Sequence, residues 1–436
     1  MPAGLAARLA VATIVADVMG FGTPLDERFG PEVAPGRFVD LDLRDRALVR
    51  SIATVSFRRL GTIRAALARF LERSLPKKLG MLEWILVTAA AQILFMDIPD
   101  HAAVDLAVRA VRRDPKTAMF ASLVNAVLRN IARERESLVA DTDPFLDTPA
   151  WLAARWRKTY GEAVARGIAE AHRLEPTLDL TVKDDPQAWA TRLGGIVLPT
   201  GSVRLTSHVP VVDLPGYSEG QWWVQDAAAA LPALLLGVQP EERVADLCAA
   251  PGGKTAQLAS RGARVVAFDR SAERLKRLSA NLERLRLTAD ITVGDILTCQ
   301  AGPFDAVLLD APCTATGTIR RHPDVAWIKR ASDIPALAAM QAKMLDRAVA
   351  MVRPGGRIVY CTCSLEPEEG EAQIAALLRR NPDVVRAPVK SEEIFGLAEC
   401  LTPAGDLRTL PTHLPDPKPR LSGLAAFFAA RLVRRL

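Results

Sequence analysis

Two cysteines stand one residue apart in the stretch YCTCSL (360–365), and a third follows a carboxylate in VLLDAPC (307–313). A cysteine thiolate is a good nucleophile, and a nearby carboxyl group can stabilise charge that develops on a substrate. A cysteine at the end of a strand can equally fill a core, bind a metal or form half of a disulfide. The first question is therefore which of these roles Cys313, Cys361 and Cys363 have.

Metal binding and disulfide formation are the weaker alternatives. The chain of 436 residues has six cysteines and five scattered histidines and no CxxC pair, whereas zinc sites need closely spaced ligands. Within CTC, an extended backbone would hold the two Cα atoms about 6.5 Å apart, near the limit for a disulfide. No signal peptide is recognisable in the first twenty residues. We therefore predict reduced thiols in a cytoplasmic protein that has no metal site.

A glycine-containing turn in VADLCAAPGGKTAQLA (244–259) predicts a ligand site. An apolar run ends there in a polar turn that opens a helix. Open α/β sheets bind their ligands at this place, outside the end of a strand and beside a helix N-terminus. The spacing matches neither GxGxxG nor the P-loop, so a dinucleotide or a nucleoside triphosphate is disfavoured.

Three later strand-like runs end in aspartates, namely Asp269, Asp295 and Asp310. Asp269 alone could simply cap the helix that follows it. Because the carboxyl ends of parallel strands meet at one edge of a sheet, however, we expect all three to lie near the glycine turn. A carboxylate can accept hydrogen bonds from both hydroxyl groups of a ribose. This edge is therefore predicted to bind a nucleoside-shaped ligand.

A thiolate and a carboxylate beside a nucleoside cofactor suit one reaction in particular, the methylation of carbon 5 of a pyrimidine. Carbon 5 is a poor nucleophile, but addition of a thiolate at carbon 6 makes it enamine-like. A carboxyl group near N3 can stabilise the charge that develops on the ring. Spacing alone does not choose the nucleophile among Cys313, Cys361 and Cys363.

The elements that position these residues differ along the chain. From about residue 220 onward, strand-like and helical runs alternate and predict an α/β fold with a doubly wound, mostly parallel sheet. Residues from about 150 to 215 are typical of a small α+β segment. Residues 4 to about 140 have apolar positions three and four apart and predict a helical bundle. The apolar run 79–97 contains Glu83 and Gln92, so it predicts a buried core helix rather than a membrane span.

The positive charge of the chain is concentrated at its N-terminal end. Residues 1–140 contain 20 Lys and Arg against 15 Asp and Glu, an excess of five in a total net charge of +6. A basic segment favours an acidic partner such as nucleic acid, although a solvated helix surface is the alternative. A second basic cluster, Arg320, Arg321 and His322, is a further candidate for phosphate contacts.

Three motifs resemble those of one known family. DLCAAPGGKT (246–255), LLDAPCTATGTIRRHPDVAW (308–327) and PGGRIVYCTCSLEPEE (354–369) are similar to motifs of the bacterial RsmB (Sun/Fmu) family, S-adenosylmethionine-dependent rRNA cytosine-C5 methyltransferases. YSEGQWWVQDAAAALPALLL (217–236) resembles the family's entry into the catalytic domain. The helical segment at the start resembles the NusB-like RNA-binding domain of that family, so the resemblance covers nearly the whole chain.

The resemblance implies a class I S-adenosylmethionine-dependent methyltransferase fold, with a Rossmann-like doubly wound sheet, preceded by an all-α NusB-like domain and a small α+β segment. The expected domains are 1–140 (NusB-like, RNA-binding), 145–218 (small α+β) and 219–436 (catalytic). It also implies transfer of a methyl group to carbon 5 of a cytosine in RNA through a covalent cysteine–carbon 6 adduct. The expected substrate is small-subunit (16S) rRNA, and the protein is expected to be a monomer without membrane or metal partners.

The alternatives are a relative that acts on tRNA or on another rRNA position, and a non-catalytic RNA-binding assembly factor. The motifs do not separate the first alternative from the expected activity, although the NusB-like segment favours RsmB-type proteins. The presence of Cys313, Cys363, Asp310 and Lys254 argues against the second.

The resemblance assigns a role to each cysteine of the motifs. Cys363, in the family's TCS motif, is the expected nucleophile, and Cys313 is expected to assist release of the methylated base. Asp310 is expected to lie between cofactor and cytosine and to serve both. Cys361 stands where the family often has a small residue, so it is interpreted as an occupant of the strand.

The expected cofactor residues come from the turn and the strand ends. Asp269 is expected to accept from the ribose hydroxyls, and Asp295 to lie near the adenine, with Arg274 close to them. The methionine end and the ribose of S-adenosylmethionine would lie against the turn, formed by Cys248, Ala249, Ala250, Pro251, Gly252, Gly253 and Lys254.

The sequence departs from the family pattern at three places. Ala315 and Thr316 replace residues that are usually Ser or Gly, TVK (181–183) replaces RVN, and GLAAFF (423–428), with Ala425 and Ala426, replaces DGFF. The last two departures concern surfaces on the substrate side, so we expect them to bear on the choice of target cytosine rather than on the chemistry.

Overall fold

The chain divides into two units in the computed structural model, which describes residues 4–29, 41–71, 75, 80–207 and 209–436. Unit 1 comprises Met1–Arg173 together with Ile319–Arg330, and unit 2 comprises Leu174–Thr318 and Ala331–Leu436. This division differs from the predicted boundary near residue 140, because unit 1 continues to Arg173 and includes a second, later segment. The predicted domain 1–140 also includes residues 30–40, 72–74 and 76–79, which lie outside the described residues.

Unit 1 is helical where it is described. Short 3-10 segments occur at Leu25–Phe29, Ala118–Phe120 and Pro144–Asp147. The helices are α1 (Leu5–Phe21), α2 (Leu43–Arg58), α3 (Leu60–Phe70), α4 (Gly80–Phe95), α5 (Asp100–Arg113), α6 (Ala121–Arg133), α7 (Arg135–Val139), α8 (Ala150–Tyr160), α9 (Glu162–His172) and α14 (Val325–Ile328).

Helix α4 forms the centre of the unit 1 core. Leu86, Ala90 and Ile93 have no exposed surface and pack in one cluster with residues of the surrounding helices. Gln92 lies within this helix, where its side chain accepts from Arg8 Nε and donates to the carbonyl of Thr88. Among the described residues no helix is long and apolar enough to cross a membrane. The prediction of a buried core helix at 79–97 is confirmed for its described part.

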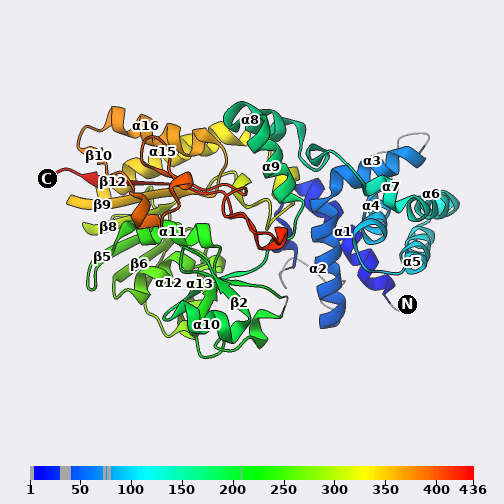
Figure 1. The fold of residues 1–436 in the computed structure, drawn as a ribbon, viewed down its shortest axis with the longest axis horizontal. Helices are drawn as coiled ribbons and strands as arrows, with labels where there is room; N and C mark the ends of the chain where they lie inside the picture. Colours follow the sequence, from blue (N-terminus) through cyan, green and yellow to red (C-terminus); the bar gives the residue numbers. More distant parts are fainter. Residues whose placement is uncertain (1–3, 30–40, 72–74, 76–79, 208) are drawn as a thin grey trace. The chain divides into compact units, whose positions relative to one another are not determined.

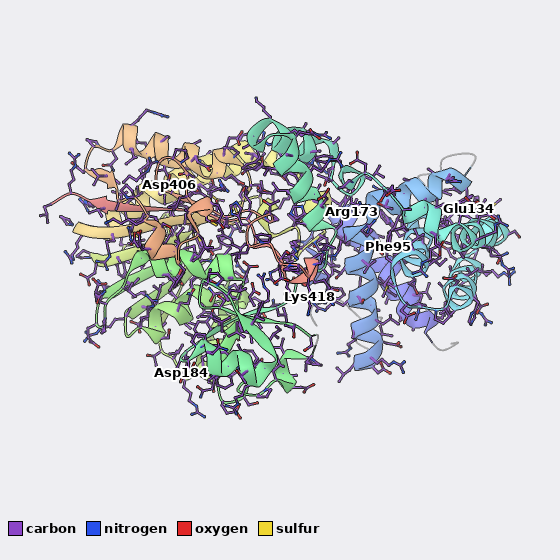
Figure 2. The ribbon with its side chains drawn as sticks, in the orientation of Figure 1. Phe95, Glu134, Arg173, Asp184, Asp406 and Lys418 are labelled. Carbon is purple, nitrogen blue, oxygen red and sulfur yellow. The ribbon has the colours of Figure 1, made fainter. Side chains whose placement is uncertain are left out.

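A buried carboxylate explains why unit 1 extends past residue 140. Asp147 accepts from Arg59 Nε at 3.0 Å, from the backbone N–H of Thr62 at 2.8 Å and from Arg173 Nε at 2.9 Å. Arg173, labelled in Figure 2, directly follows α9. The charged hydrogen bonds therefore join α3, the Pro144–Asp147 segment and the end of α9 into one body.

The segment Ile319–Arg330 is also built into unit 1. The carbonyl of Arg320 accepts from Arg58 Nη1 at 2.7 Å, and Trp327 Nε1 donates to the carbonyl of Phe57 at 2.9 Å. His322 pairs with Asp26 at 3.0 Å, and the Arg320 side chain is only 5% exposed. Two of the three residues proposed to meet phosphate, Arg320 and His322, are therefore engaged in holding unit 1 together.

Unit 2 begins with a small antiparallel sheet in the order β2-β3-β1-β4. Its elements are β1 (Asp179–Val182), α10 (Pro186–Leu193), β2 (Gly195–Val197), β3 (Val203–Leu205) and β4 (Trp222–Val224), with a 3-10 segment at Val211–Asp213 between β3 and β4. Asp179 is fully buried, accepts from Arg204 Nε at 2.7 Å and also accepts from the N–H of Ala227, where α11 begins. The pair joins the small sheet to the helix that leads into the large one.

The large sheet has the order β10-β12-β9-β8-β5-β6-β7, with β11 beside β12. Figure 1 shows β10, β12, β9, β8, β5 and β6 side by side in this sequence. Strands β5 to β9 are parallel to one another, whereas β12 is antiparallel to both β9 and β10. The strands are β5 (Arg243–Leu247), β6 (Arg264–Asp269), β7 (Asp290–Val293), β8 (Phe304–Asp310), β9 (Val352–Thr362), β10 (Val384–Arg386), β11 (Leu407–Arg408) and β12 (Phe428–Arg434).

Helices cover both faces of this sheet. Within β8, Leu308 packs in one apolar cluster with Leu231 of α11, and the next residue, Leu309, packs in another with Leu345 of α15. Alternation of this kind is expected of a strand buried on both sides. The doubly wound fold is thus confirmed. The helices are α11 (Ala227–Leu236), α12 (Gly253–Ser260), α13 (Ala272–Leu285), α15 (Asp333–Met351) and α16 (Glu371–Arg380), with 3-10 segments at Thr316–Thr318, Pro367–Glu369, Ser391–Ile394, Ala398–Cys400 and Pro419–Leu421.

Candidate active site

The carboxyl ends of four adjacent strands bring most of the predicted residues to one edge of the sheet. The strand order reverses at β5, which pairs with β6 on one side and β8 on the other. In register, Leu247 of β5 stands beside Phe268 of β6 and Leu309 of β8, while Asp310 stands beside Cys361 of β9. A topological switch point of this type is where open α/β sheets bind their ligands.

The turn after β5 has two residues with a left-handed backbone conformation. Cys248 has φ 63° and Gly252 has φ 103°, both in the left-handed region. A Cβ atom at Gly252 would lie 2.8 Å from Cγ of Leu278, too close for a side chain to fit without a shift. Glycine is therefore favoured here, because it lets the turn at the N-terminus of α12 pack closely against α13.

Asp269, at the end of β6, holds this turn in place. Its carboxylate accepts from the N–H groups of Ala250 at 3.2 Å and Ser271 at 2.9 Å, and the side chain is 4% exposed. Arg274 lies 3.6 Å from the same carboxylate and also donates to the carbonyl of Ala250. A carboxylate has about four acceptor positions, so capacity for a further donor remains.

Asp295 differs from the other aspartates. Its side chain is exposed, and Oδ1 accepts from the N–H of Leu297 at 2.9 Å, which closes a local turn. The backbone before it is fixed to the site, because the N–H of Gly294 donates to the carbonyl of Asp269. In the structure, the Asp295 side chain therefore closes a local turn, and its place near the adenine stays a prediction.

Lys254 and Asp310 form an ion pair in the centre of the edge. Lys254 Nζ lies 2.8 Å from Asp310 Oδ2, and the Sγ of Cys361 donates to Oδ1 of the same carboxylate at 3.5 Å. Burial alone would lower the pKa of Lys254, but the charge of Asp310 and other nearby acidic groups outweighs it and raises the pKa above the ordinary value. Asp310 is thus held in one orientation between β5 and β9.

Asp246 is a site residue that the sequence interpretation missed. It precedes the glycine turn by one residue of β5, is fully buried, and accepts from Thr255 Oγ1 at 2.6 Å through Oδ2. Its Oδ1 has no hydrogen-bond partner among the described residues. Burial raises the pKa of Asp246 to about 7. A carboxyl group inside the apolar run VADL was the available signal, because buried acidic groups are rare outside sites.

Cys313 and Cys363 meet at the same edge although fifty residues separate them in the chain. Their Sγ atoms are 3.5 Å apart, and both side chains are half-buried. The hydrogen bond to Cys363, followed by burial, raises the pKa of Cys313 well above its ordinary value. Either sulfur can be the donor in this contact, so the structure brings the two thiols together without fixing which one gives the proton.

Cys361 takes no part in the Cys313–Cys363 contact, although Cys363 packs against the apolar cluster that contains it. Its side chain has no exposed surface and packs among apolar residues on the α11 side of the sheet. Burial, followed by the charge of Asp310, raises the pKa of Cys361 well above its ordinary value. A buried thiol of this kind is poorly suited to attack a substrate, because the thiolate is the nucleophile.

Among the described residues no group of acidic, cysteine and histidine side chains is arranged to hold a metal ion.

The strand order and the turn after β5 define a class of protein, the Rossmann-like methyltransferases. A crystal structure titled PH0851 matches the whole chain with a TM-score of 0.75 at 23% identity, covering 99% of that chain. A methyltransferase homolog protein from Pyrococcus horikoshii matches 67% of this chain and 98% of its own, with a TM-score of 0.55 at 29% identity. These likenesses confirm the predicted class I fold.

Comparison of sequences identifies the family. Residues 233–432 match the family described as "16S rRNA methyltransferase RsmB/F", and residues 5–133 match the NusB family. The chain is 38% identical to "Ribosomal RNA small subunit methyltransferase B" of Xanthomonas campestris, over 91% of this chain and 92% of that protein. The protein of the same name from Vibrio cholerae is 36% identical over 86% and 90%. The chain belongs to the RsmB/F family of rRNA methyltransferases, as its motifs predicted.

Proposed function

We propose that this protein transfers a methyl group from S-adenosylmethionine to carbon 5 of a cytosine in small-subunit rRNA, through a covalent adduct between Cys363 and carbon 6. The observation that carries the proposal is the 3.5 Å contact between Cys313 and Cys363, at the same sheet edge as the Lys254–Asp310 pair. The reaction requires a thiolate nucleophile, and a second thiol in contact with it can take part in proton transfer when the nucleophile leaves. The name of the relatives in Xanthomonas campestris and Vibrio cholerae supports the substrate.

The residues of the edge fit S-adenosylmethionine. The N-terminus of α12 can receive the methionine carboxylate, and the remaining acceptor capacity of Asp269 suits a ribose hydroxyl. The unpartnered Oδ1 of Asp246 is an acceptor in the same region, which favours a ligand that carries donors and positive charge. When bound, the cofactor supplies an electrophilic methyl group. The Cys248–Lys254 turn, Asp269 and Arg274 would hold it.

Cys363 and Cys313 have different roles in the proposed reaction. The thiolate of Cys363 adds to carbon 6, and the Lys254–Asp310 pair, whose ammonium group is positively charged, offsets the electron density that moves onto the ring near N3. After methylation a base removes the proton from carbon 5, the double bond between carbons 5 and 6 forms again, and Cys363 leaves as a thiolate. Cys313, in contact with Cys363 Sγ, is placed to exchange a proton with the departing sulfur.

The proposal is tested by following the product. The purified protein, tritiated S-adenosylmethionine and unmodified 16S rRNA should give labelled 5-methylcytidine on nucleoside digestion. Bisulfite sequencing of rRNA from a strain that lacks the gene should show one cytosine that has lost its protection. Label in tRNA or in large-subunit rRNA alone would favour the alternative substrates, and the absence of label in any RNA would favour a non-catalytic assembly factor.

The basic surface of unit 1 is the proposed contact with RNA. Arg112, Arg113 and Lys116 are exposed together at the end of α5. Replacing all three by Gln should weaken rRNA binding in filter assays and reduce the log–log salt slope by about 0.7 to 0.9 for each phosphate that is no longer neutralised. The same change to the paired residues Arg109 and Asp105 is the control, since their charges already compensate each other. Equal affinity and equal slope in the triple variant would place the RNA elsewhere.

A further inference from the structure

One buried carboxylate, which the proposed mechanism does not use, is hydrogen-bonded to residues next to the two cysteines. Glu369 ends the 3-10 segment Pro367–Glu369 and has no exposed surface. Four groups donate to its two oxygens: the N–H of Thr314 at 2.9 and 3.2 Å, the hydroxyl of Thr314, the hydroxyl of Ser364 at 2.6 Å and Gln341 Nε2 at 3.1 Å. Both oxygens therefore act only as acceptors.

These contacts involve the residues on both sides of Cys313. Thr314, the residue that follows Cys313, donates to Glu369 through both its backbone and its side chain. Pro312, the residue that precedes it, accepts through its carbonyl from Gln341 Nε2 at 2.8 Å, and the same nitrogen donates to Glu369. The loop is thus tied to the carboxylate on both sides of its cysteine.

Glu369 also accepts hydrogen bonds from the residues on both sides of Cys363. Ser364, which follows Cys363, donates to the Glu369 carboxylate, and the hydroxyl of Thr362, which precedes it, donates to the Glu369 carbonyl at 3.1 Å. Tyr360 on β9 donates to that carbonyl as well, at 2.7 Å. One residue therefore receives hydrogen bonds from the neighbours of both sulfurs.

We propose that Glu369 is a positioning residue for the methyl transfer, which fixes the Cys313 and Cys363 loops to each other so that the two sulfurs meet. The inference rests on the proposed function for its catalytic meaning, although the positioning itself does not. Hydrogen bonds to an ionised acceptor are strong and directional, so they fix loops more firmly than apolar packing does. A purely structural carboxylate has no reason to take its donors from the residues next to both cysteines.

The first test measures the sulfur pair without any enzyme activity. In a glutathione redox buffer the two thiols of Cys313 and Cys363 form a disulfide, while one oxidised glutathione takes up their two electrons and two protons and becomes two reduced molecules. Peptide mapping gives the equilibrium fraction. Glu369→Gln places an amide N–H against groups that donate, so the loops separate and the effective concentration of one thiol at the other should fall about tenfold or more.

The second test measures turnover and adduct formation. In Glu369→Gln, kcat for rRNA methylation should fall about 100-fold, since misplacement of reacting groups by 1 Å costs about that much. The KM for RNA and the dissociation constant for S-adenosylmethionine should stay within about twofold of wild type. Trapping with RNA that contains 5-fluorocytidine should give correspondingly less covalent protein–RNA complex, because addition of Cys363 is itself impaired.

Gln373→Met is the matched control. Gln373 is a buried polar residue four positions beyond Glu369, and it donates to the carbonyls of Ala338 and Glu368 but to neither cysteine loop. Loss of the two hydrogen bonds that Gln373 donates should lower the melting temperature, while the Cys313–Cys363 disulfide equilibrium and kcat stay at wild-type values. If Glu369→Gln does not fold, Ser364→Ala removes one donor and leaves the carboxylate, and it should shift the disulfide equilibrium in the same direction.

The outcomes separate the two proposals. A wild-type protein that forms no 5-methylcytidine would refute the proposed function, yet the disulfide equilibrium would still decide the role of Glu369. An unchanged equilibrium in folded Glu369→Gln would overturn the positioning role, whatever the activity. An altered equilibrium with wild-type kcat would also overturn it, because the two sulfurs would then not need to be held.

Discussion

The two halves of the candidate active site are built in different ways. On the β5–β6 side, the turn and the aspartate that holds it are close in the chain: Asp269 accepts from Ala250, nineteen residues earlier, and from Ser271, two residues later. On the β8–β9 side, Cys313 meets Cys363 across fifty residues, and Thr314 meets Glu369 across fifty-five. The cofactor half is therefore mostly local in the sequence, and the cysteine half is not.

This difference implies that binding of the cofactor and attack on the base are separable. The backbone ladder between β5 and β8 joins the two halves, and among the side chains of the described residues the clearest link is the pair of Lys254 on α12 with Asp310 on β8. Substitutions in the cysteine half should then change the chemistry and leave cofactor affinity intact, while substitutions around Asp269 should do the reverse. Each prediction below tests one side of that comparison.

The largest effect is expected for Cys363→Ala. Removal of the proposed nucleophile should reduce methyl transfer to background, since no other thiol is both half-exposed and in contact with Cys313 at this edge. The dissociation constant for S-adenosylmethionine, measured by titration calorimetry, should stay near wild type. Retained turnover in this variant, together with an inactive Cys361→Ala, would reverse the assignment of the two cysteines.

The next largest effect is expected for Cys313→Ala. Without a partner for Cys363, the methylated base should be released slowly, and turnover should fall roughly 100-fold, the usual range for loss of a proton-transfer group. Denaturing gels with labelled RNA should then show a slow protein–RNA band that disappears in the Cys313→Ala/Cys363→Ala double variant. A variant that turns over slowly but shows no such band would leave Cys313 without its proposed role in release.

Asp269→Ala tests the other half of the site. The loss of charge-assisted hydrogen bonds, each about 1.5–3 kcal/mol, should weaken S-adenosylmethionine binding by at least tenfold. Part of that loss comes from the ribose contact and part from the freed N–H of Ala250, which Asp269 now fixes. At saturating cofactor, kcat should recover. Asp295→Ala is the comparison, because the Asp295 side chain closes its own turn and is predicted near the adenine rather than the ribose; equal losses in both variants would move the ribose contact away from Asp269.

The same contrast explains what the sequence could predict. Asp269 and Asp310 end strands whose short apolar runs are visible in the sequence, and the carboxyl ends of parallel strands meet at one edge of a sheet. The turn was recognisable from its glycine pair, and the left-handed φ of 103° at Gly252 is the local reason why a glycine stands there. Fold class and the cofactor edge could thus be read from short segments.

Other features depended on contacts between distant segments. Glu369 belongs to an acidic run, SLEPEE, that resembles a solvated loop, and only its burial against Thr314 and Ser364 gives it a role. The basic cluster at 320–322 looked suited to phosphate, but Arg320 is buried in unit 1, where its carbonyl accepts from Arg58. The sequence shows that a side chain is charged, but only the tertiary contacts show whether it is buried and which groups it binds.

The smallest effect is expected for Cys361→Ala, the variant that separates two cysteines one residue apart. Cys361 lies in the strand and donates to Asp310, whereas Cys363 lies beyond the end of β9 and contacts Cys313. Truncation of a buried side chain should cost about 1–2 kcal/mol of stability, visible as a lower melting temperature. Since Lys254 still holds the other oxygen of Asp310, methyl transfer should stay within about threefold of wild type.

Cys361→Ser sharpens this last test. The hydroxyl keeps a donor for Asp310 but is more costly to bury than a thiol, so the serine variant should be at least as destabilised as the alanine variant while its turnover stays closer to wild type. Such a result would mean that Cys361 acts on the reaction only by orienting Asp310. Activity lost equally in both variants, with melting temperatures unchanged, would instead give Cys361 a direct part in the chemistry, and the division between a buried strand thiol and a half-exposed catalytic pair would not hold.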